Sequence, residues 1–153
     1  MIRTKNRLRL CVTLLVLNLL FIWGNSLMPG EISGAISQWV RDLLSGLFPG
    51  GSDPNEGHGL LRKLAHFTEF ACLGILLCWL CAMLRKRLLY SFMSGFLVAC
   101  VDETIQRFIP DRGPSFRDVL IDTAGVAVGI ALLMAGYAIY QTRKQKNLEE
   151  NKQ

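Results

Sequence analysis

The residues of this chain that could do chemistry are ionisable and amide side chains in three short segments of an otherwise apolar sequence. Within each segment the spacing is that of one helix face, because residues three or four positions apart are neighbours on a helix. The three groups are His66 with Glu69, Asp102 with Glu103 and Gln106, and Asp118 with Asp122. Charges in apolar segments cost free energy unless they are paired or functional. We therefore treat all seven as candidate site residues. Asp118 is a candidate ligand-binding residue, and the other six are candidate catalytic residues.

Three kinds of chemistry are compatible with these residue types. Carboxylate oxygens and an imidazole nitrogen are suitable ligands for a divalent cation. Clustered carboxylates in a partly dry site can also perform acid–base work, because they raise one another's pKa. Basic side chains nearby could instead hold an anionic phosphate or carboxylate, and Arg112 is best placed to do so. The spacing indicates a polar site without choosing among these chemistries, and it names no cofactor.

Four apolar segments are long enough to be the elements that position these groups. A helix needs about 20 mainly apolar residues to cross the hydrocarbon core of a membrane. The four segments are roughly 8–28, 64–84, 88–109 and 119–140. They leave too little chain for a separate soluble core, so the sequence predicts one all-α membrane domain over residues 1–153. Its architecture is a four-transmembrane-helix bundle, followed by a basic cytoplasmic tail over residues 141–153.

The basic residues are unevenly divided between the two ends of these segments. Eleven Lys and Arg and only two Glu precede the first span, join the second to the third, or follow the fourth, which gives +9. The rest of the chain has six basic and ten acidic residues, or −4, and the whole chain is +5. The positive-inside rule therefore predicts that both termini are in the cytoplasm. Sorted in this way, the net charge does not indicate a nucleic-acid partner.

Residues of about 31–48 have a different pattern from the spans. Apolar residues, including Ile32, Ile36, Trp39 and Leu43, recur with the spacing of one helix face. The pattern predicts an extracytoplasmic amphipathic helix, either flat on the outer leaflet or packed on the outer ends of the spans. In both positions it could cover a site beneath it. Residues 49–59 are rich in turn formers and are predicted to be a loop.

The alternating direction of the spans brings the three polar groups to one depth. The second span begins, the third ends and the fourth begins on the outer side, within a slab on the order of 10 Å thick. These groups could simply hold the bundle together, and Ser115 with Asp118 resembles a capping box. However, a polar contact between membrane helices contributes only about 0.6 kcal/mol, whereas a charge at mid-bilayer costs ~3 kcal/mol or more. We therefore favour a functional site.

Four segments of the chain, 25–30, 62–70, 102–112 and 118–125, contain these groups and their immediate neighbours. Together they resemble the VanZ-like family of bacterial membrane proteins, named for a protein associated with teicoplanin resistance. The resemblance implies a small integral membrane protein of the cell envelope, with a link to glycopeptide susceptibility, and supplies no reaction. Ser26 and Lys63 lie in these segments and join Arg112 and Asp118 as expected ligand-binding residues.

The leading functional hypothesis is a polar, acidic pocket that binds or modifies a membrane lipid or a lipid-linked cell-wall precursor. One alternative is a metal-assisted membrane hydrolase or transferase, with Glu103 or Asp122 as base and His66 as ligand or acid. Another is a non-catalytic assembly or regulatory subunit in which Gly125 and Gly129 contact a partner helix. An ion-conducting pathway is disfavoured, because the cytoplasmic half of the second to fourth spans has almost no polar residues.

Overall fold

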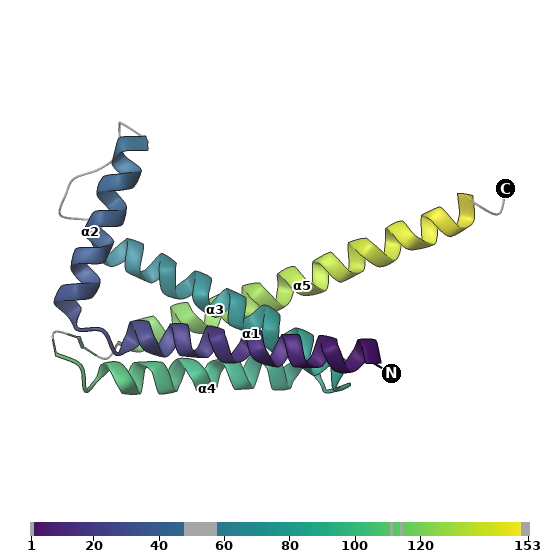
Figure 1. Ribbon diagram of the computed structural model, residues 1–153, viewed down its shortest axis with the longest axis horizontal. Coiled ribbons are helices and arrows are strands. Elements are labelled where there is room, and N and C mark those ends of the chain that lie inside the picture. Colours follow the sequence, from purple (N-terminus) through teal and green to yellow (C-terminus); the bar gives the residue numbers. More distant parts are fainter. Residues whose placement is uncertain (1, 48–57, 111, 114, 151–153) are drawn as a thin grey trace.

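The computed structural model describes residues 2–47, 58–110, 112–113 and 115–150, and over these residues the chain is helical, without strands. Four long apolar helices run along the bundle in alternating directions, and a shorter helix lies across one end of them (Figure 1). The helices are α1 (Ile2–Ser26), α2 (Gly30–Leu47), α3 (His58–Met83), α4 (Leu88–Gln106) and α5 (Phe116–Glu150). The predicted all-α class, with four spans and one additional amphipathic helix, is confirmed.

The helix ends differ from the predicted spans. α1 occupies Ile2–Ser26 instead of 8–28, and α3 begins at His58, inside the predicted 49–59 loop and ahead of residue 64. α4 ends at Gln106, before residue 109. α1 and α3 begin earlier because backbone hydrogen bonding continues into polar residues beyond the apolar segment. α4 ends earlier because Phe108 and Ile109 form a turn, in which their N–H groups donate to the carbonyl oxygens of Ile105 and Gln106. The rest of the predicted loop, residues 49–57, lies outside the described residues.

α5 is much longer than the predicted 119–140 span. It has 35 residues, which corresponds to about 52 Å at 1.5 Å per residue and exceeds the ~30 Å hydrocarbon core. Most of the predicted basic tail, 141–153, is therefore helical, up to Glu150. The reason is local, because residues 141–150 contain no Gly or Pro and are rich in Gln, Lys, Arg and Glu, which favour helix.

α3 and α5 make the most extensive helix contact of the bundle. A Cβ added at Gly125 would meet the carbonyl oxygen of Phe67, and one added at Gly129 would collide with the carbonyl oxygen of Ala71. The Gly125-x-x-x-Gly129 motif therefore permits the close approach of two helices, but both helices belong to this chain. α3 occupies the surface at which we expected a partner helix.

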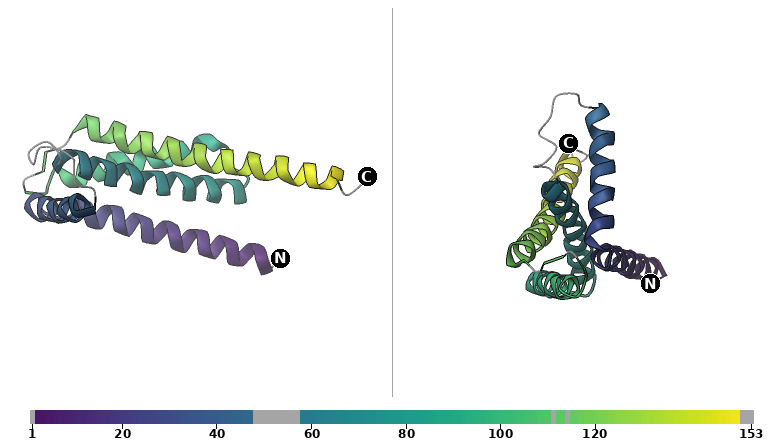
Figure 2. Two further views of the ribbon diagram at one scale, coloured as in Figure 1. Left: turned by 90° about the horizontal axis from the view of Figure 1, so that it is seen from above. Right: turned by 90° about the vertical axis from the view of Figure 1, so that its left-hand side faces the viewer.

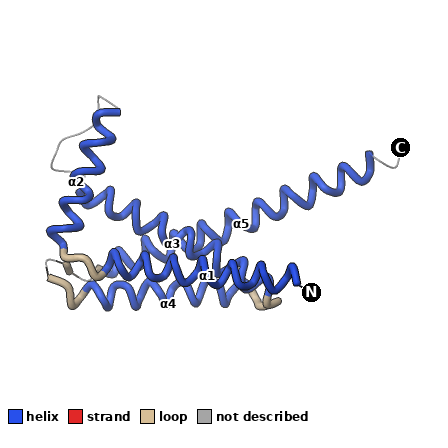
Figure 3. The backbone as a smooth tube through the Cα atoms, viewed as in Figure 1, coloured by secondary structure: helices blue, strands red, loops and turns tan. Residues whose placement is uncertain are grey.

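The ends of α1 and α4 and the beginnings of α3 and α5 lie at the same end of the bundle, next to α2. We call this the polar end. Two connections meet there, because the N–H of Gly30 donates a 3.3 Å hydrogen bond to the carbonyl oxygen of Pro110. The two loops lie close together in Figure 3. The start of α1 and the end of α5 both lie on the side away from α2 (Figure 2).

The apolar core lies between α3, α4 and α5, with a contribution from α1. Phe70, Leu73 and Val126 are completely or almost completely buried there, and Ile22 reaches the same core from α1. Other apolar residues of the spans face outward, as a membrane-embedded surface requires. The core therefore fixes the four helices that carry the polar residues at one end.

Candidate functional site

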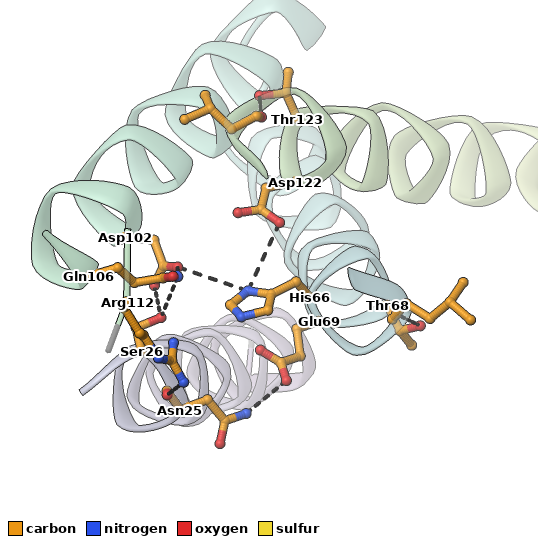
Figure 4. A network of polar contacts seen from close by, with 12 residues as sticks. Asn25, Ser26, His66, Thr68, Glu69, Asp102, Gln106, Arg112, Asp122 and Thr123 are labelled. Carbon is orange, nitrogen blue, oxygen red and sulfur yellow. Dashed lines mark hydrogen bonds and ion pairs between the residues drawn. The ribbon is translucent and has the colours of Figure 1, made fainter. Parts of the chain in front are cut away.

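The centre of the polar end is a cluster of three residues from three helices: His66 of α3, Asp102 of α4 and Asp122 of α5. The Nδ1 atom of His66 lies 3.9 Å from Asp102 Oδ2 and 4.0 Å from Asp122 Oδ1 (Figure 4). Asp102 is 0% and Asp122 1% exposed. The structure thus brings one member of each predicted polar group into a single buried cluster, which we call the HDD cluster.

Asp102 is firmly held by neighbouring side chains. Ser26, the last residue of α1, donates a 2.5 Å hydrogen bond from its hydroxyl to Asp102 Oδ1. Gln106 Nε2 donates to Asp102 Oδ2 at 2.9 Å and to the Ser26 hydroxyl at 3.4 Å. Both carboxylate oxygens of Asp102 therefore accept a hydrogen bond. This network joins the end of α1 to the end of α4.

Asp122 has a different environment. Neither of its carboxylate oxygens has a hydrogen-bond partner among the described residues, and the same is true of His66 Nδ1. A buried carboxylate without partners carries a desolvation cost that a cation, a proton or a donor group can offset. One ligand atom from each residue of the HDD cluster lies within 4.8 Å of the others. The cluster has the residue types and proximity that a metal ion requires.

Glu69 faces away from the HDD cluster, although it follows His66 by only three residues. Asn25 Nδ2 donates a 2.7 Å hydrogen bond to Glu69 Oε1, and Asn18 Nδ2 donates to the Glu69 backbone oxygen at 3.5 Å. Positions three apart on a helix differ by about 60° in direction. His66 consequently faces α4 and α5, whereas Glu69 faces α1 (Figure 4).

Glu103 holds the beginning of α5. Its Oε2 atom accepts a 2.8 Å hydrogen bond from the backbone N–H of Ser115. In the predicted capping box, Asp118 would accept this hydrogen bond. That prediction is wrong, because Glu103 of α4 takes the place of the local acceptor. Asp118 Oδ1 has no hydrogen-bond partner in the part of the chain that the structure describes.

Arg112 is a buried cation at the polar end, only 9% exposed. Its Nη2 donates a 2.9 Å hydrogen bond to the backbone oxygen of Asn25, whereas Nε and Nη1 have no partner among the described residues. Burial and the positive charge of Arg62 lower the pKa of Arg112, while three nearby carboxylates act in the opposite direction. An arginine nevertheless stays protonated at neutral pH, so two charged donor groups are available to a ligand.

A cavity of about 490 Å³ lies between α1, α2 and α3. Its walls are mainly apolar, with Phe21 and Leu64 among them, and its polar lining is Asn25, Ser33, Ser37, Arg62, His66, Thr68, Glu69 and Arg112. We call it the amphiphile-sized cavity. Its volume is within the range of about 300–1,000 Å³ that is typical of small-molecule sites.

α2 forms one wall of this cavity. Ser33, Ile36 and Ser37 line it, whereas Trp39 and Leu43 are 65% and 55% exposed. Figure 1 shows α2 crossing the end of the bundle. α2 thus covers the site and also presents large apolar side chains outward, so it has features of both predicted placements.

A second cavity, of about 10 Å³, lies beside the HDD cluster, and this volume is about that of one water molecule. It is lined by Arg62, Lys63, His66, Glu103, Gln106, Asp118, Ile121 and Asp122. Members of all three predicted polar groups therefore meet at one small space. His66 and Arg62 line both cavities and so connect the HDD cluster with the amphiphile-sized cavity.

Asn25 and Arg62 belong to this site, although neither was predicted as a site residue. Asn25 contacts both Glu69 and Arg112, and Arg62 lines both cavities. One feature of the sequence could have identified Asn25. Asn18 and Asn25 are seven positions apart, on one face of an otherwise apolar span, where polar side chains usually have a partner.

A model of the VanZ/LLP1 family matches residues 9–139 of the chain. The matched region extends over most of the chain and includes the HDD cluster, both cavities and the whole of α2. The resemblance predicted from the segments at Ser26, His66, Asp102 and Asp122 is thereby confirmed. No curated protein and no solved structure matches the chain.

Proposed function

The chain belongs to the VanZ/LLP1 family, and we propose that it binds an anionic amphiphile, a lipid or lipid-linked component of the cell envelope. In this proposal the apolar part of the ligand occupies the amphiphile-sized cavity. The anionic head of the ligand, for example a phosphate, contacts Arg112.

The observation that carries this proposal is the state of Arg112. The guanidinium is almost fully buried, lines the cavity and has two donor groups without a partner among the described residues. Buried donors of a charged group are costly to leave unsatisfied. Nε and Nη1 lie on different edges of the planar guanidinium, so each can donate its own charge-assisted hydrogen bond to a phosphate or carboxylate oxygen. An anionic head is therefore the chemistry that complements this end of the cavity.

The other walls of the cavity support an apolar tail. Phe21 and Leu64 line it and are also 59% and 53% exposed, so the cavity continues onto the outer surface of the span helices. That surface faces lipid in a membrane protein. An acyl or prenyl chain can thus lie partly in the cavity and partly in the bilayer, while the head remains at the polar end.

The division of charge supports an extracytoplasmic location for the site. The residues of the +9 group that the structure describes lie at the end of the bundle opposite α2 or in the last turns of α5, and the described residues of the −4 group lie toward the polar end. By the positive-inside rule, this distribution supports a polar end on the outer side and both termini in the cytoplasm. Altered teicoplanin susceptibility is the phenotype that the resemblance to the VanZ-like family leads us to expect.

Binding can be tested with a pair of lipids that differ only in the phosphate. Purified protein is titrated with a polyprenyl phosphate and with the corresponding polyprenol, and complexes are quantified by native mass spectrometry. We expect the phosphate form to bind more tightly. Arg112→Gln should lower its affinity by about 10-fold or more, since a hydrogen bond to a charged group contributes roughly 1.5–3 kcal/mol.

Arg117→Gln is the matched control, because Arg117 is an exposed arginine a few residues away. Arg112→Lys keeps the charge but not the planar set of fixed donors, so it should recover only part of the affinity. Thermal unfolding of each variant separates loss of binding from loss of folding. Equal affinity for the phosphate and the alcohol, or equal affinity of the Arg112→Gln and Arg117→Gln variants, would contradict the proposal.

A further inference from the structure

We infer that His66, Asp102 and Asp122 form a binding site for one divalent transition-metal ion. The geometry of the three residues is suited to a single ion. The three ligand atoms come from three helices and lie within 4.8 Å of one another, and the two distances from His66 Nδ1 are 3.9 and 4.0 Å. Ligand atoms that each lie about 2.0–2.2 Å from one ion are roughly 3–4 Å apart. Small side-chain movements would therefore complete the coordination.

The surroundings of Asp122 support the site independently of the clustering of acidic residues. The carboxylate of Asp122 is 1% exposed, and neither oxygen has a hydrogen-bond partner among the described residues. Its side chain points toward His66, whose Nδ1 also has no hydrogen-bond partner in the described parts of the chain (Figure 4). Asp102, with a second buried carboxylate, faces the same histidine nitrogen. A doubly charged cation would supply a partner for all three groups and balance both carboxylates.

The surroundings of Asp102 are those of a metal ligand. Its oxygens accept hydrogen bonds from Ser26 and Gln106, which fix the orientation of the carboxylate. Outer hydrogen bonds of this kind orient the ligands of metal sites and strengthen metal binding. In contrast, purely structural polar contacts would be expected to satisfy Asp122 as fully as they satisfy Asp102.

The ligand types indicate the class of metal. Ca²⁺ and Mg²⁺ prefer ligand sets made only of oxygen atoms, whereas an imidazole with two carboxylates suits Zn²⁺, Mn²⁺ or Fe²⁺. Three protein ligands leave at least one coordination position for water or substrate, as in catalytic zinc sites. The 10 Å³ cavity adjoins two of the three ligands, His66 and Asp122, and offers that space.

Metal binding can be measured directly, without knowledge of any substrate. The protein is purified with a tag that contains no histidine, treated with a chelator and titrated with Zn²⁺, Mn²⁺ and Mg²⁺ by isothermal calorimetry. We expect one Zn²⁺ or Mn²⁺ per chain and much weaker binding of Mg²⁺. Asp122→Asn should abolish this binding, and Ser26→Ala should weaken it by about 10-fold or more, as loss of an outer hydrogen bond typically does.

Two carboxylate variants control for charge. Asp118 lines the same small cavity and Glu69 lies on the other face of α3, but neither is in the HDD cluster. Asp118→Asn and Glu69→Gln remove a negative charge but no ligand, so they should lower the metal affinity far less than Asp122→Asn does. If either control variant lowers the metal affinity as much as Asp122→Asn does, the ion is held by the general negative charge and not by coordination to Asp122. That result would overturn the inference. Unchanged affinity in Asp122→Asn, or no stoichiometric binding by the wild-type protein, also overturns it.

A spectroscopic measurement keeps the inference testable if Asp122→Asn does not fold. The chain has two histidines, His58 and His66. Pulsed electron paramagnetic resonance of bound Mn²⁺ should detect one coordinating nitrogen, which persists in His58→Gln and disappears in His66→Gln. Absence of nitrogen coupling in the wild type would overturn the site. Because this experiment uses the metal alone, its outcome is independent of whether the amphiphile binds at Arg112.

Discussion

The backbone N–H of Ser115 donates a 2.8 Å hydrogen bond to Glu103 Oε2, so a side chain of α4 holds the beginning of α5. The first amide groups of a helix have no partner within the helix, and Glu103 supplies an acceptor next to them. This relationship fixes the ends of two helices to each other directly beside the HDD cluster. The stability of the fold should therefore depend on the acceptor at position 103.

We expect Glu103→Ala to lower the free energy of unfolding by about 1–2 kcal/mol, the usual effect of losing an acceptor at a helix start. Glu103→Gln should lower the free energy of unfolding by a smaller amount, because an amide oxygen can accept the same hydrogen bond. Thermal unfolding in detergent measures both effects. Glu149→Ala, at an exposed position near the end of α5, serves as control. Equal losses in Glu103→Ala and Glu149→Ala would contradict the assigned role.

Gly129→Ala should strongly destabilise the protein. The added Cβ would collide with the backbone oxygen of Ala71, which cannot move without shifting α3. Overpacking of this kind typically costs about 1–3 kcal/mol. Unfolding of the purified variant and its abundance in membranes are the measurements.

Gly136→Ala is the matched control, because nothing lies within 4 Å of a Cβ at Gly136. There the substitution should stabilise α5 by about 0.5–1 kcal/mol, the helix advantage of alanine over glycine. Destabilisation at both positions would indicate that glycine is required for a reason other than the contact between α3 and α5.

Ser37→Phe should reduce binding of the polyprenyl phosphate without loss of folding. Ser37 lines the amphiphile-sized cavity, so a phenyl ring there would occupy part of the space assigned to the ligand. Gln38→Phe adds the same ring to the exposed side of α2 and should leave binding unchanged. If both variants bind as tightly as the wild type, the ligand does not use this cavity.

Impermeant thiol reagents can test the side of the membrane. Gly113 lies at the polar end and Lys86 at the opposite end of the bundle, and both are exposed. On intact cells, Gly113→Cys should react, and Lys86→Cys should react only after the membrane is permeabilised. The wild-type protein is the control for reaction of the native cysteines. The reverse pattern would move the proposed lipid site to the cytoplasmic side.

The general arrangement of the site could be predicted from the sequence because it depends on properties of single segments. The length of each apolar segment gives the number of spans, and the alternating direction of the spans gives the depth of His66, Asp102 and Asp122. The same reasoning could not assign partners. Whether Glu69 faces the HDD cluster or Asn25 depends on which helix lies next to that side of α3, which is a relation between distant segments.

Local patterns failed where a distant group competed with them. The sequence around Ser115 predicts a capping box with Asp118, but Glu103 comes from another helix and accepts the hydrogen bond. The glycines at 125 and 129 predict a close helix contact correctly, yet the pattern cannot state which helix makes it. For α5, hydropathy predicts where the hydrocarbon ends, whereas the helix continues through polar residues that favour the same conformation.

The glycines of α5 also determine the width of the HDD cluster. Gly125 follows Asp122 by three residues, and a Cβ added at Gly125 would meet the backbone oxygen of Phe67, the residue after His66. A methyl group at position 125 would push α5 away from α3. The distance between the Asp122 carboxylate and the His66 imidazole would then increase. The absence of a side chain at Gly125 thus contributes to the short distance between the Asp122 carboxylate and the His66 imidazole.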